Sequence, residues 1–592
     1  MAPLDKNNPT NDDEEPQMTS RDPSRLRSNY PRGSSPWVYR LSQWRVLGYS
    51  DEELERPKVA IVNSSSELAI CFSHLDAIVP KLKEAIYAAG GLALEVRTAA
   101  PSDFITSIGR GGRYILPTRD LIVSDIEVAV EGAMLDAMVC LASCDKTTPA
   151  QLMAAGRLDI PTIIVPCGYQ SSGRYCDAHF DIEDVFANSG KVHSGEVTLD
   201  ELEAMAKSAI TSPGVCSGMG TANTMHITAE ALGMALPGSA PVRANSDVMW
   251  EIVERSGRRI VEMIDEDLRP RKILTEAAFK NAVAVVLSAS GSINAVKHLQ
   301  AIAVEADCPI DIWKEFEDQA PKVPLLTDVK PNGEHHIDEL ERAGGARALM
   351  HELSPVLDLD AQTIVGRLGD VLADATPSDR SVIRPFDDPL GTDPTILIVR
   401  GSLAPSGAIV KRAVVDTRPK RFTGEAVIFH TREEAIAALE AGEIHPGHVV
   451  VLRGLGPKGA PGMAFVSGFV FALEGSGLAP QVAVVTDAQL SGLVNKGLVV
   501  GEVAPEAAAG GPLGLVEPGD TITIDLDRRA VDLEVAPEVL ARREPHVPRQ
   551  DYHRSYLNVY AHTVDRSERG FALAAELDAP GVQGAQGAEP RP

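Results

Sequence analysis

The sequence lacks an excess of positive charge, and this absence limits the partners that it can have. Its 592 residues include 56 Lys and Arg against 83 Asp and Glu, which gives a formal net charge of −27 at pH 7. Proteins that bind nucleic-acid phosphates need concentrated Lys and Arg, so we expect no nucleic-acid partner. A hydrophobic share of 44% and a charged share of 23% are ordinary for a globular protein with a large core.

The sequence also lacks long apolar runs and any Cys-x-x-Cys pair. No stretch approaches 18 uninterrupted apolar residues, so no transmembrane helix is expected. The polar stretch 1–34 has no apolar segment of the signal-peptide kind. The seven cysteines are odd in number and widely spaced, which argues against a disulfide framework and favours a reducing compartment. We therefore expect a cytoplasmic protein.

The pattern of apolar residues divides the chain into an α/β part and a β-rich part. Residues 35–380 alternate short strands with amphipathic helices, which favours a large N-terminal parallel α/β domain. Residues 381–394 are rich in Pro and Asp and are predicted to be a linker. Residues 395–575 are predicted to form a smaller, β-rich C-terminal domain. The remaining segments, 1–34 and 576–592, are predicted to be disordered tails.

Three cysteines carry most of the chemical information. Cys71, Cys144 and Cys216 lie 73 and 72 residues apart, each at the predicted end of a strand or start of a helix. Three thiolates that converge from three loops can hold an iron–sulfur cluster with one iron position left open. An open metal position is a place for substrate. Taken alone, Cys144 with its neighbours Asp145 and Lys146 could equally be a capped turn with a surface ion pair.

Two further loops could contribute to a site. The Gly- and Ser-rich loop Gly214–Asn223 precedes an apolar helix, and its backbone amides suit an anion such as a carboxylate, although such turns are also common structural features. Ser491 stands on a predicted sharp turn after a strand. A serine there can act as a nucleophile or base, or its hydroxyl can simply satisfy the turn.

Together these motifs resemble the dihydroxy-acid and sugar-acid dehydratases, a family that includes dihydroxy-acid dehydratase, phosphogluconate dehydratase and the aldonate dehydratases. The resemblance runs in the same order along the chain from about residue 35 to residue 570. It rests on Cys71-Phe-Ser-His74, Ser143-Cys-Asp-Lys146, Cys216-Ser-Gly-Met-Gly-Thr-Ala-Asn223, Gly456-Pro-Lys-Gly-Ala-Pro-Gly-Met463 and Thr486-Asp-Ala-Gln-Leu-Ser-Gly492.

The resemblance implies an iron–sulfur-dependent hydro-lyase that dehydrates a 2,3-dihydroxy carboxylic acid to a 2-oxo acid. Cys71, Cys144 and Cys216 match the ligands of a [2Fe-2S] cluster, and Ser491 matches the proposed base. A small dihydroxy acid is the expected substrate, and branched-chain amino acid biosynthesis is the expected pathway. The resemblance also implies a homodimer or homotetramer.

The resemblance also implies a magnesium ion. Asp103, Asp145 and Lys146 match its ligands, the lysine after carbamylation, because a carbamate offers the oxygen atoms that magnesium prefers and an ammonium does not. The motifs do not decide between two classes of substrate. Leu116-Pro-Thr-Arg119 and Met153-Ala-Ala-Gly-Arg157 favour dihydroxy-acid dehydratase, whereas Thr147-Thr-Pro149 favours an aldonate dehydratase that yields 2-keto-3-deoxy acids.

Four positions depart from the family pattern. Phe465 stands where the family usually has a metal-binding glutamate, Gln489 replaces an arginine, and Ser290 and Ile293 change a Gly-Gly-Ser-Thr-Asn segment. Magnesium could keep water instead of the glutamate; Phe465 and Ile293 could form an apolar wall for a less polar substrate; or the chain could be a catalytically degenerate iron–sulfur paralogue. We favour altered specificity, because the predicted ligands and base are all retained.

Overall fold

The computed structural model describes residues 25–100, 102–107, 109–414, 418–491, 494, 497–548 and 554–574. Its first sheet has four parallel strands in the order β2-β1-β3-β4. Every residue of β1 and β3 is buried, as expected for a parallel sheet that is covered on both faces. The strands are β1 Lys58–Asn63, β2 Leu92–Arg97, β3 Ala137–Ala142 and β4 Thr162–Pro166.

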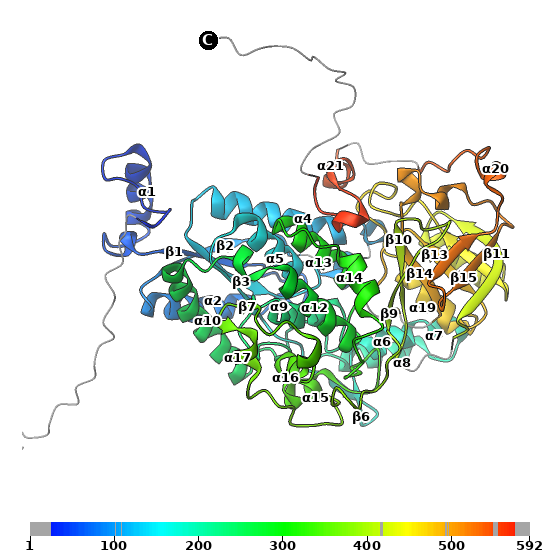
Figure 1. Ribbon diagram of the computed structural model, residues 1–592, viewed down its shortest axis with the longest axis horizontal. Coiled ribbons are helices and arrows are strands. Elements are labelled where there is room, and N and C mark those ends of the chain that lie inside the picture. The colour runs from blue at the N-terminus through cyan, green and yellow to red at the C-terminus, as the bar shows by residue number, and fades with distance from the viewer. Residues whose placement is uncertain are drawn as a thin grey trace, which may run out of the picture.

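Helices cover this sheet and continue into a helical layer beyond it. Helix α10 packs against α2, β3 and β4, and α5 packs against α4 and α13 (Figure 1). The alternation of strand and helix that was predicted up to residue 380 ends at β4, because the longer elements that follow in this domain are helices. Helices that precede β4 include α2 Leu75–Ala88, α4 Ile115–Ile126 and α5 Thr147–Leu158. Those that follow it include α6 Ile182–Ser189, α8 Leu199–Ser208, α9 Thr221–Ala231, α10 Asp247–Glu266, α12 Glu276–Ser288, α13 Asn294–Glu305, α14 Ile312–Gln319, α15 Ile337–Ala343 and α16 Gly345–Glu352.

The second sheet has eight strands in the order β16-β15-β11-β12-β13-β14-β10-β9. Its centre, from β11 to β14, is parallel, and antiparallel strands flank it. The apolar segments 395–399, 426–429, 448–452, 482–485 and 521–524 predict five of these strands, and 432–441 predicts helix α18 Arg432–Glu440; β10, β14, β16 and helix α19 Ser467–Gly475 were not predicted. The strands are β9 Ile396–Val399, β10 Gly407–Lys411, β11 Arg421–Phe429, β12 His448–Leu452, β13 Ala483–Thr486, β14 Leu498–Ala504, β15 Thr521–Asp525 and β16 Ala530–Leu533.

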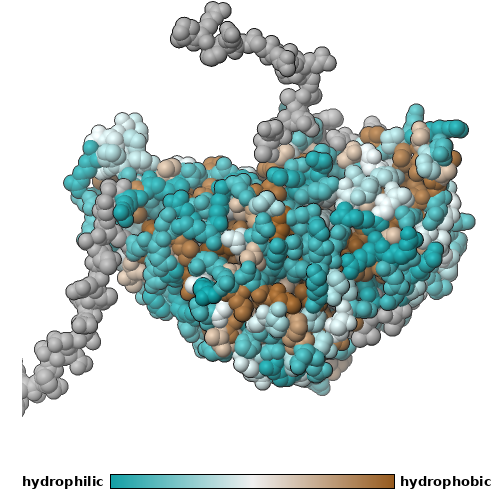
Figure 2. All heavy atoms as spheres, in the orientation of Figure 1, coloured by the Kyte–Doolittle hydropathy of each residue, from teal (hydrophilic) through white to brown (hydrophobic). Residues whose placement is uncertain are grey.

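The fold class is therefore confirmed: a parallel α/β sheet with helices, and a separate sheet in the C-terminal region. Figure 1 shows the two parts side by side, with the second sheet in yellow and orange. The face in Figure 2 is mainly hydrophilic, in keeping with the net charge of −27. No helix in the described part of the chain is long and apolar enough to cross a membrane.

Residues in the predicted N-terminal tail and in the predicted linker make specific contacts. Ser28, in the predicted tail, is buried, and its amide donates a 3.0 Å hydrogen bond to Oδ1 of Asp136. In the predicted linker, the amide of Leu325 donates to the carbonyl of Gly391 over 2.9 Å, and Ile383 is fully buried. Residues 1–24 and 576–592 of the predicted tails lie outside the described residues.

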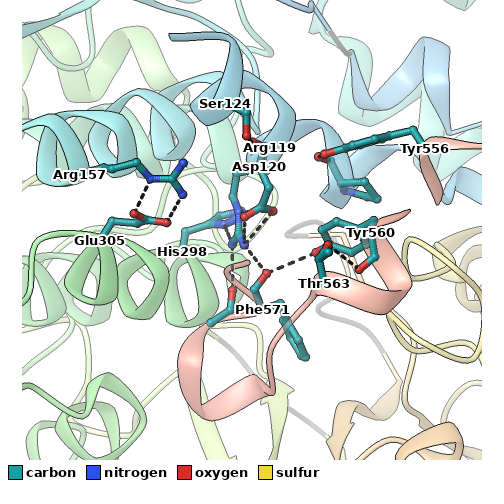
Figure 3. A network of polar contacts seen from close by, with 12 residues as sticks. Arg119, Asp120, Ser124, Arg157, His298, Glu305, Tyr556, Tyr560, Thr563 and Phe571 are labelled. Carbon is teal, nitrogen blue, oxygen red and sulfur yellow. Dashed lines mark hydrogen bonds and ion pairs between the residues drawn. The ribbon is translucent and has the colours of Figure 1, made fainter. Parts of the chain in front are cut away.

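The C-terminal segment returns to the first domain and is anchored there by Arg119 (Figure 3). The guanidinium of this fully buried arginine donates to the carbonyl of Gly570 over 3.0 Å and to that of Phe571 over 2.8 Å. Arg157 forms a bidentate pair with Glu305, at 2.8 and 2.6 Å. Arg119 and Arg157 end the two motifs that favour dihydroxy-acid dehydratase over an aldonate dehydratase. In the structure, Arg119 holds the C-terminal segment and Arg157 links α5 to α13.

Candidate functional site

A cavity of about 230 Å³ is lined by residues of both domains. Four of the residues that the sequence singled out, Asp103, Asp145, Cys216 and Ser491, share its wall. The other lining residues are Ser107, Glu183, Phe186, Ser189, Gly218, Gly220, Thr221, Ala222, Arg432, Phe465, Gly468 and Phe471.

The three predicted cysteines lie near one another at this site. Cys71 and Cys144 follow β1 and β3, which are neighbours, and the carboxyl ends of neighbouring parallel strands meet at one sheet edge. A hydrogen bond with Cys71, together with burial, raises the pKa of the Cys144 thiol. Cys216 comes from the loop before α9, and burial raises the pKa of its thiol, as do the charges of Asp145 and Glu183.

The chemistry of the three thiols suits a metal cluster. Within the described residues, the sulfurs do not form a set that lies wholly within 4.8 Å, as a single ion would need. A two-iron cluster distributes its ligands over both irons. The Cys71 thiol contacts Cys144 through a hydrogen bond that helps to raise the pKa of Cys144, and burial raises the pKa of Cys216; a bound metal would deprotonate its thiol ligands. The residues therefore fit an iron–sulfur cluster.

The predicted magnesium ligands form a buried polar group beside the cysteines. Lys146 is fully buried, and its Nζ lies 3.7 Å from Oδ2 of Asp103. Burial and the neighbouring charge of Asp145 raise the pKa of Asp103 well above its ordinary range. Neither Nζ of Lys146 nor Oδ1 of Asp103 has a hydrogen-bond partner within the described part of the chain. The unpartnered oxygen of the buried Asp103, beside the half-buried Asp145, fits a hard cation, and the unpartnered amine fits carbamylation.

Ser491 reaches the cavity from the second domain. It follows β13, and its amide donates a 2.8 Å hydrogen bond to Oγ of Ser467 in α19. Nδ2 of Asn294, the first residue of α13, bonds both the carbonyl of Leu490, at 3.3 Å, and Oγ1 of Thr221, at 2.9 Å. This amide links the serine turn to the loop that carries Cys216, so it fixes the two sides of the cavity relative to each other.

Only one of the four departures from the family pattern lines the cavity. Phe465 does so, and its amide bonds the carbonyl of Gly111 at 2.8 Å. Gln489 is buried behind it and pairs with Ala464 through the backbone. Oγ of Ser290 accepts a 3.1 Å hydrogen bond from Lys411, and Ile293 is buried at the start of α13.

The hypothesis of an apolar wall therefore needs correction. Ile293 is not part of the lining; Phe186 of α6 and Phe471 of α19 accompany Phe465 instead. The position of a residue in a motif does not show whether its side chain reaches the cavity, because neighbouring residues of a turn point in different directions.

Sequence reasoning missed Glu183. This residue of α6 lines the cavity, and both carboxyl oxygens are buried without a hydrogen-bond partner among the described residues. Burial, and then the charges of Asp181 and Asp184, raise its pKa well above the ordinary value. A Cβ on Gly218 would lie 1.7 Å from Oε1, so the carboxyl lies against the loop of Cys216. A glutamate at a helix start is commonplace, and its sequence carries no functional signal.

Comparison with known proteins covers both domains. Residues 56–370 match the family model described as dihydroxy-acid/6-phosphogluconate dehydratase N-terminal, and residues 381–571 match the corresponding C-terminal model. The chain is 40% identical to the dihydroxy-acid dehydratase of Ignicoccus hospitalis, over 90% of this chain and 96% of that protein. It is 38% identical to the dihydroxy-acid dehydratase of Caldicellulosiruptor saccharolyticus and 37% identical to that of Aquifex aeolicus, over 90% of this chain and 97% and 96% of those proteins.

Proposed function

This chain belongs to the dihydroxy-acid/6-phosphogluconate dehydratase family, and we propose that it is a hydro-lyase that converts a 2,3-dihydroxy carboxylic acid to a 2-oxo acid. One observation carries the proposal. Asp103, Asp145 and Cys216 from the first domain and Ser491 from the second line a single cavity, so a metal-activated hydroxyl and a base can act on the same small substrate.

Two cofactors are part of the proposal. Cys71, Cys144 and Cys216 would hold a [2Fe-2S] cluster, and Asp103 and Asp145 would hold magnesium together with carbamylated Lys146. When bound, these groups supply Lewis-acid assistance to the departing hydroxyl and positive charge for the substrate carboxylate.

The chain itself supplies the proton transfer. Ser491, as the alkoxide, removes the proton from C2 of the substrate. The C2–H electron pair forms the C2–C3 double bond as the C3–O bond breaks, and the departing hydroxide takes the proton from Ser491 and leaves as water, which restores the alkoxide. The resulting enol loses its hydroxyl proton and gains one at C3 to become the 2-oxo acid, so the net change is the loss of one water. The pKa of a serine hydroxyl must fall for this role, which positive charge in the cavity favours.

The lining favours a substrate with an apolar substituent. Phe186, Phe465 and Phe471 face the cavity, and each hydroxyl of a polyhydroxylated chain placed against these rings would lose its hydrogen bonds to water without replacement. A branched-chain dihydroxy acid avoids that cost. Arg432 adds a positive charge to the acidic lining, in keeping with a carboxylate substrate. Dehydration of an aldonate is the alternative.

A substrate panel tests the proposal. The protein is reconstituted without oxygen with iron, sulfide and Mg²⁺, and formation of 2-oxo acid is followed with 2,3-dihydroxyisovalerate, gluconate and 6-phosphogluconate. We expect turnover of the branched dihydroxy acid at least about tenfold above the others, as expected where buried hydroxyls are left unpaired. Turnover of an aldonate alone would replace this proposal by the alternative. A fully iron-loaded protein without turnover of any substrate would indicate a degenerate paralogue.

We further propose that the protein is a homodimer or homotetramer and lies in the cytoplasm. Size-exclusion chromatography tests the oligomeric state, and cell fractionation tests the location.

A further inference from the structure

His179, Asp181 and His336 form a group of metal-binding side chains outside the reaction cavity. Their ligand atoms all lie within 4.8 Å of one another, although the first two residues and the third are about 155 positions apart in sequence. We propose that this group binds a divalent transition-metal ion, zinc by its ligand chemistry, and that the ion ties the start of α6 to the start of α15.

Asp181 supplies the first argument. This residue is 1% exposed, and its Oδ1 caps α6 by accepting hydrogen bonds from the amides of Glu183, at 2.9 Å, and Asp184, at 3.1 Å. Its Oδ2 is buried without a hydrogen-bond partner and lies 3.9 Å from Nε2 of His179, which also has none within the described residues. A buried carboxylate oxygen beside an unpartnered imidazole nitrogen is costly unless something binds both, and a cation does so.

The histidines supply the second argument. The rings of His179 and His336 are stacked, with centroids 3.5 Å apart and planes at 23°. Burial, and then the proximity of His179, lower the pKa of His336, which favours the neutral form that ligates metals. The Nζ of Lys330 pairs with Oδ1 of Asp184 at 3.4 Å, and its charge also acts on Asp181 and His336.

Two imidazoles and one carboxylate suit zinc, with water in the fourth position. In a tetrahedral site the ligand atoms lie about 3.3 Å apart, so binding requires the two rings to tilt and draw together slightly. His179 also lines an open surface cavity of about 740 Å³, which gives an ion and its water a way in.

The consequence concerns the reaction cavity. Helix α6, which Asp181 caps, carries three lining residues of that cavity: Glu183, Phe186 and Ser189. An ion that fixes the first turn of α6 against α15 would therefore make one wall of the cavity more rigid. The binding itself does not depend on the proposed dehydration.

Zinc binding measured on matched variants tests the inference. The full-length protein is dialysed against a buffered low concentration of free Zn²⁺, and zinc per chain is determined by elemental analysis. His179→Gln removes one ligand, and Asp181→Asn removes the charge while its Oδ1 still caps the helix. His430→Gln is the control, because it removes a ring from a similar stacked pair, His430 and His546, with centroids 4.1 Å apart and no third ligand within the described residues.

We expect the wild type and His430→Gln to bind about one zinc per chain more than the other two variants. Zinc that binds to the cysteines is common to all four proteins and cancels in the comparison. Zinc should also raise the thermal midpoint of the wild type and not that of His179→Gln, because only a protein with the site is stabilised by the ion. Equal zinc content in all four proteins would overturn the inference.

Discussion

The Nζ of Lys146 lies 3.7 Å from the Oδ2 of Asp103, and both side chains are buried. The two groups are close enough to attract each other and too far apart for a hydrogen bond. Oδ1 of the same aspartate is also without a partner in the described part of the chain. An arrangement that leaves buried polar atoms unused is costly in a protein that only has to fold, and it supports the proposal of a metal site here.

Lys146→Arg tests that proposal without removing the positive charge. A guanidinium cannot form the carbamate, so the variant should bind Mn²⁺, as a probe for Mg²⁺, about tenfold more weakly or worse. The free Mn²⁺ signal in electron paramagnetic resonance measures this affinity. Lys330→Arg, outside the cavity lining, is the control and should bind Mn²⁺ like the wild type. Equal affinities in all three proteins would contradict the role of Lys146.

Phe465→Glu should strengthen binding of the same ion. The phenylalanine lines the cavity, and a carboxylate at this position would add an oxygen ligand to the acidic group. We expect Mn²⁺ affinity to rise about tenfold. Phe465→Gln is the control, because glutamine has nearly the size of glutamate but no charge. It shows whether the effect comes from ligation or only from the space left by the phenylalanine ring. If the glutamate and glutamine variants bind Mn²⁺ equally, Phe465 does not face the ion.

Glu183→Gln should change how stability depends on pH. Burial raises the pKa of Glu183 well above its ordinary value of 4.5, so the folded chain keeps a proton that the unfolded chain releases once the pH exceeds 4.5. The contribution of this group to stability therefore falls as the pH rises through that window. The glutamine does not titrate, so the thermal midpoint of the variant should rise relative to that of the wild type as the pH increases above 4.5. A difference that is constant with pH would show that Glu183 is ionised in the folded protein.

Arg119→Met should destabilise the protein by about 3–5 kcal/mol, because it leaves a buried carboxylate without its cation. Even with Arg119 beside it, burial raises the pKa of Asp120 to about 6. The variant also frees the carbonyls of Gly570 and Phe571. The urea midpoint measures the loss, and the exposed Arg566→Met should leave it unchanged. A loss below about 1 kcal/mol would mean that Figure 3 shows a network of little energetic weight.

The sequence predicted the parts of this fold whose patterns are local. Strand β3 could be predicted because it is a short apolar run followed by a polar turn. The proximity of Cys71 and Cys144 could be predicted because the carboxyl ends of neighbouring parallel strands meet at one edge of the sheet. Helix α9 is buried at every residue, so it lacks the polar face that would have revealed a helical layer. Glu183 was missed because its significance lies in unused oxygen atoms, which depend on what surrounds it in space.

The most direct test of the account compares the wild type with Ser491→Ala after both have been loaded with iron, sulfide and Mg²⁺. Formation of 2-oxo acid from 2,3-dihydroxyisovalerate should fall by about 100-fold or more, as expected for loss of a catalytic base, while the iron content stays the same. Ser189→Ala, which changes another serine of the lining, should retain most of the activity. If Ser491→Ala keeps its full iron and still turns over at the rate of the wild type, the serine is not the base, and the account of a cavity shared by thiols, carboxylates and this hydroxyl is wrong.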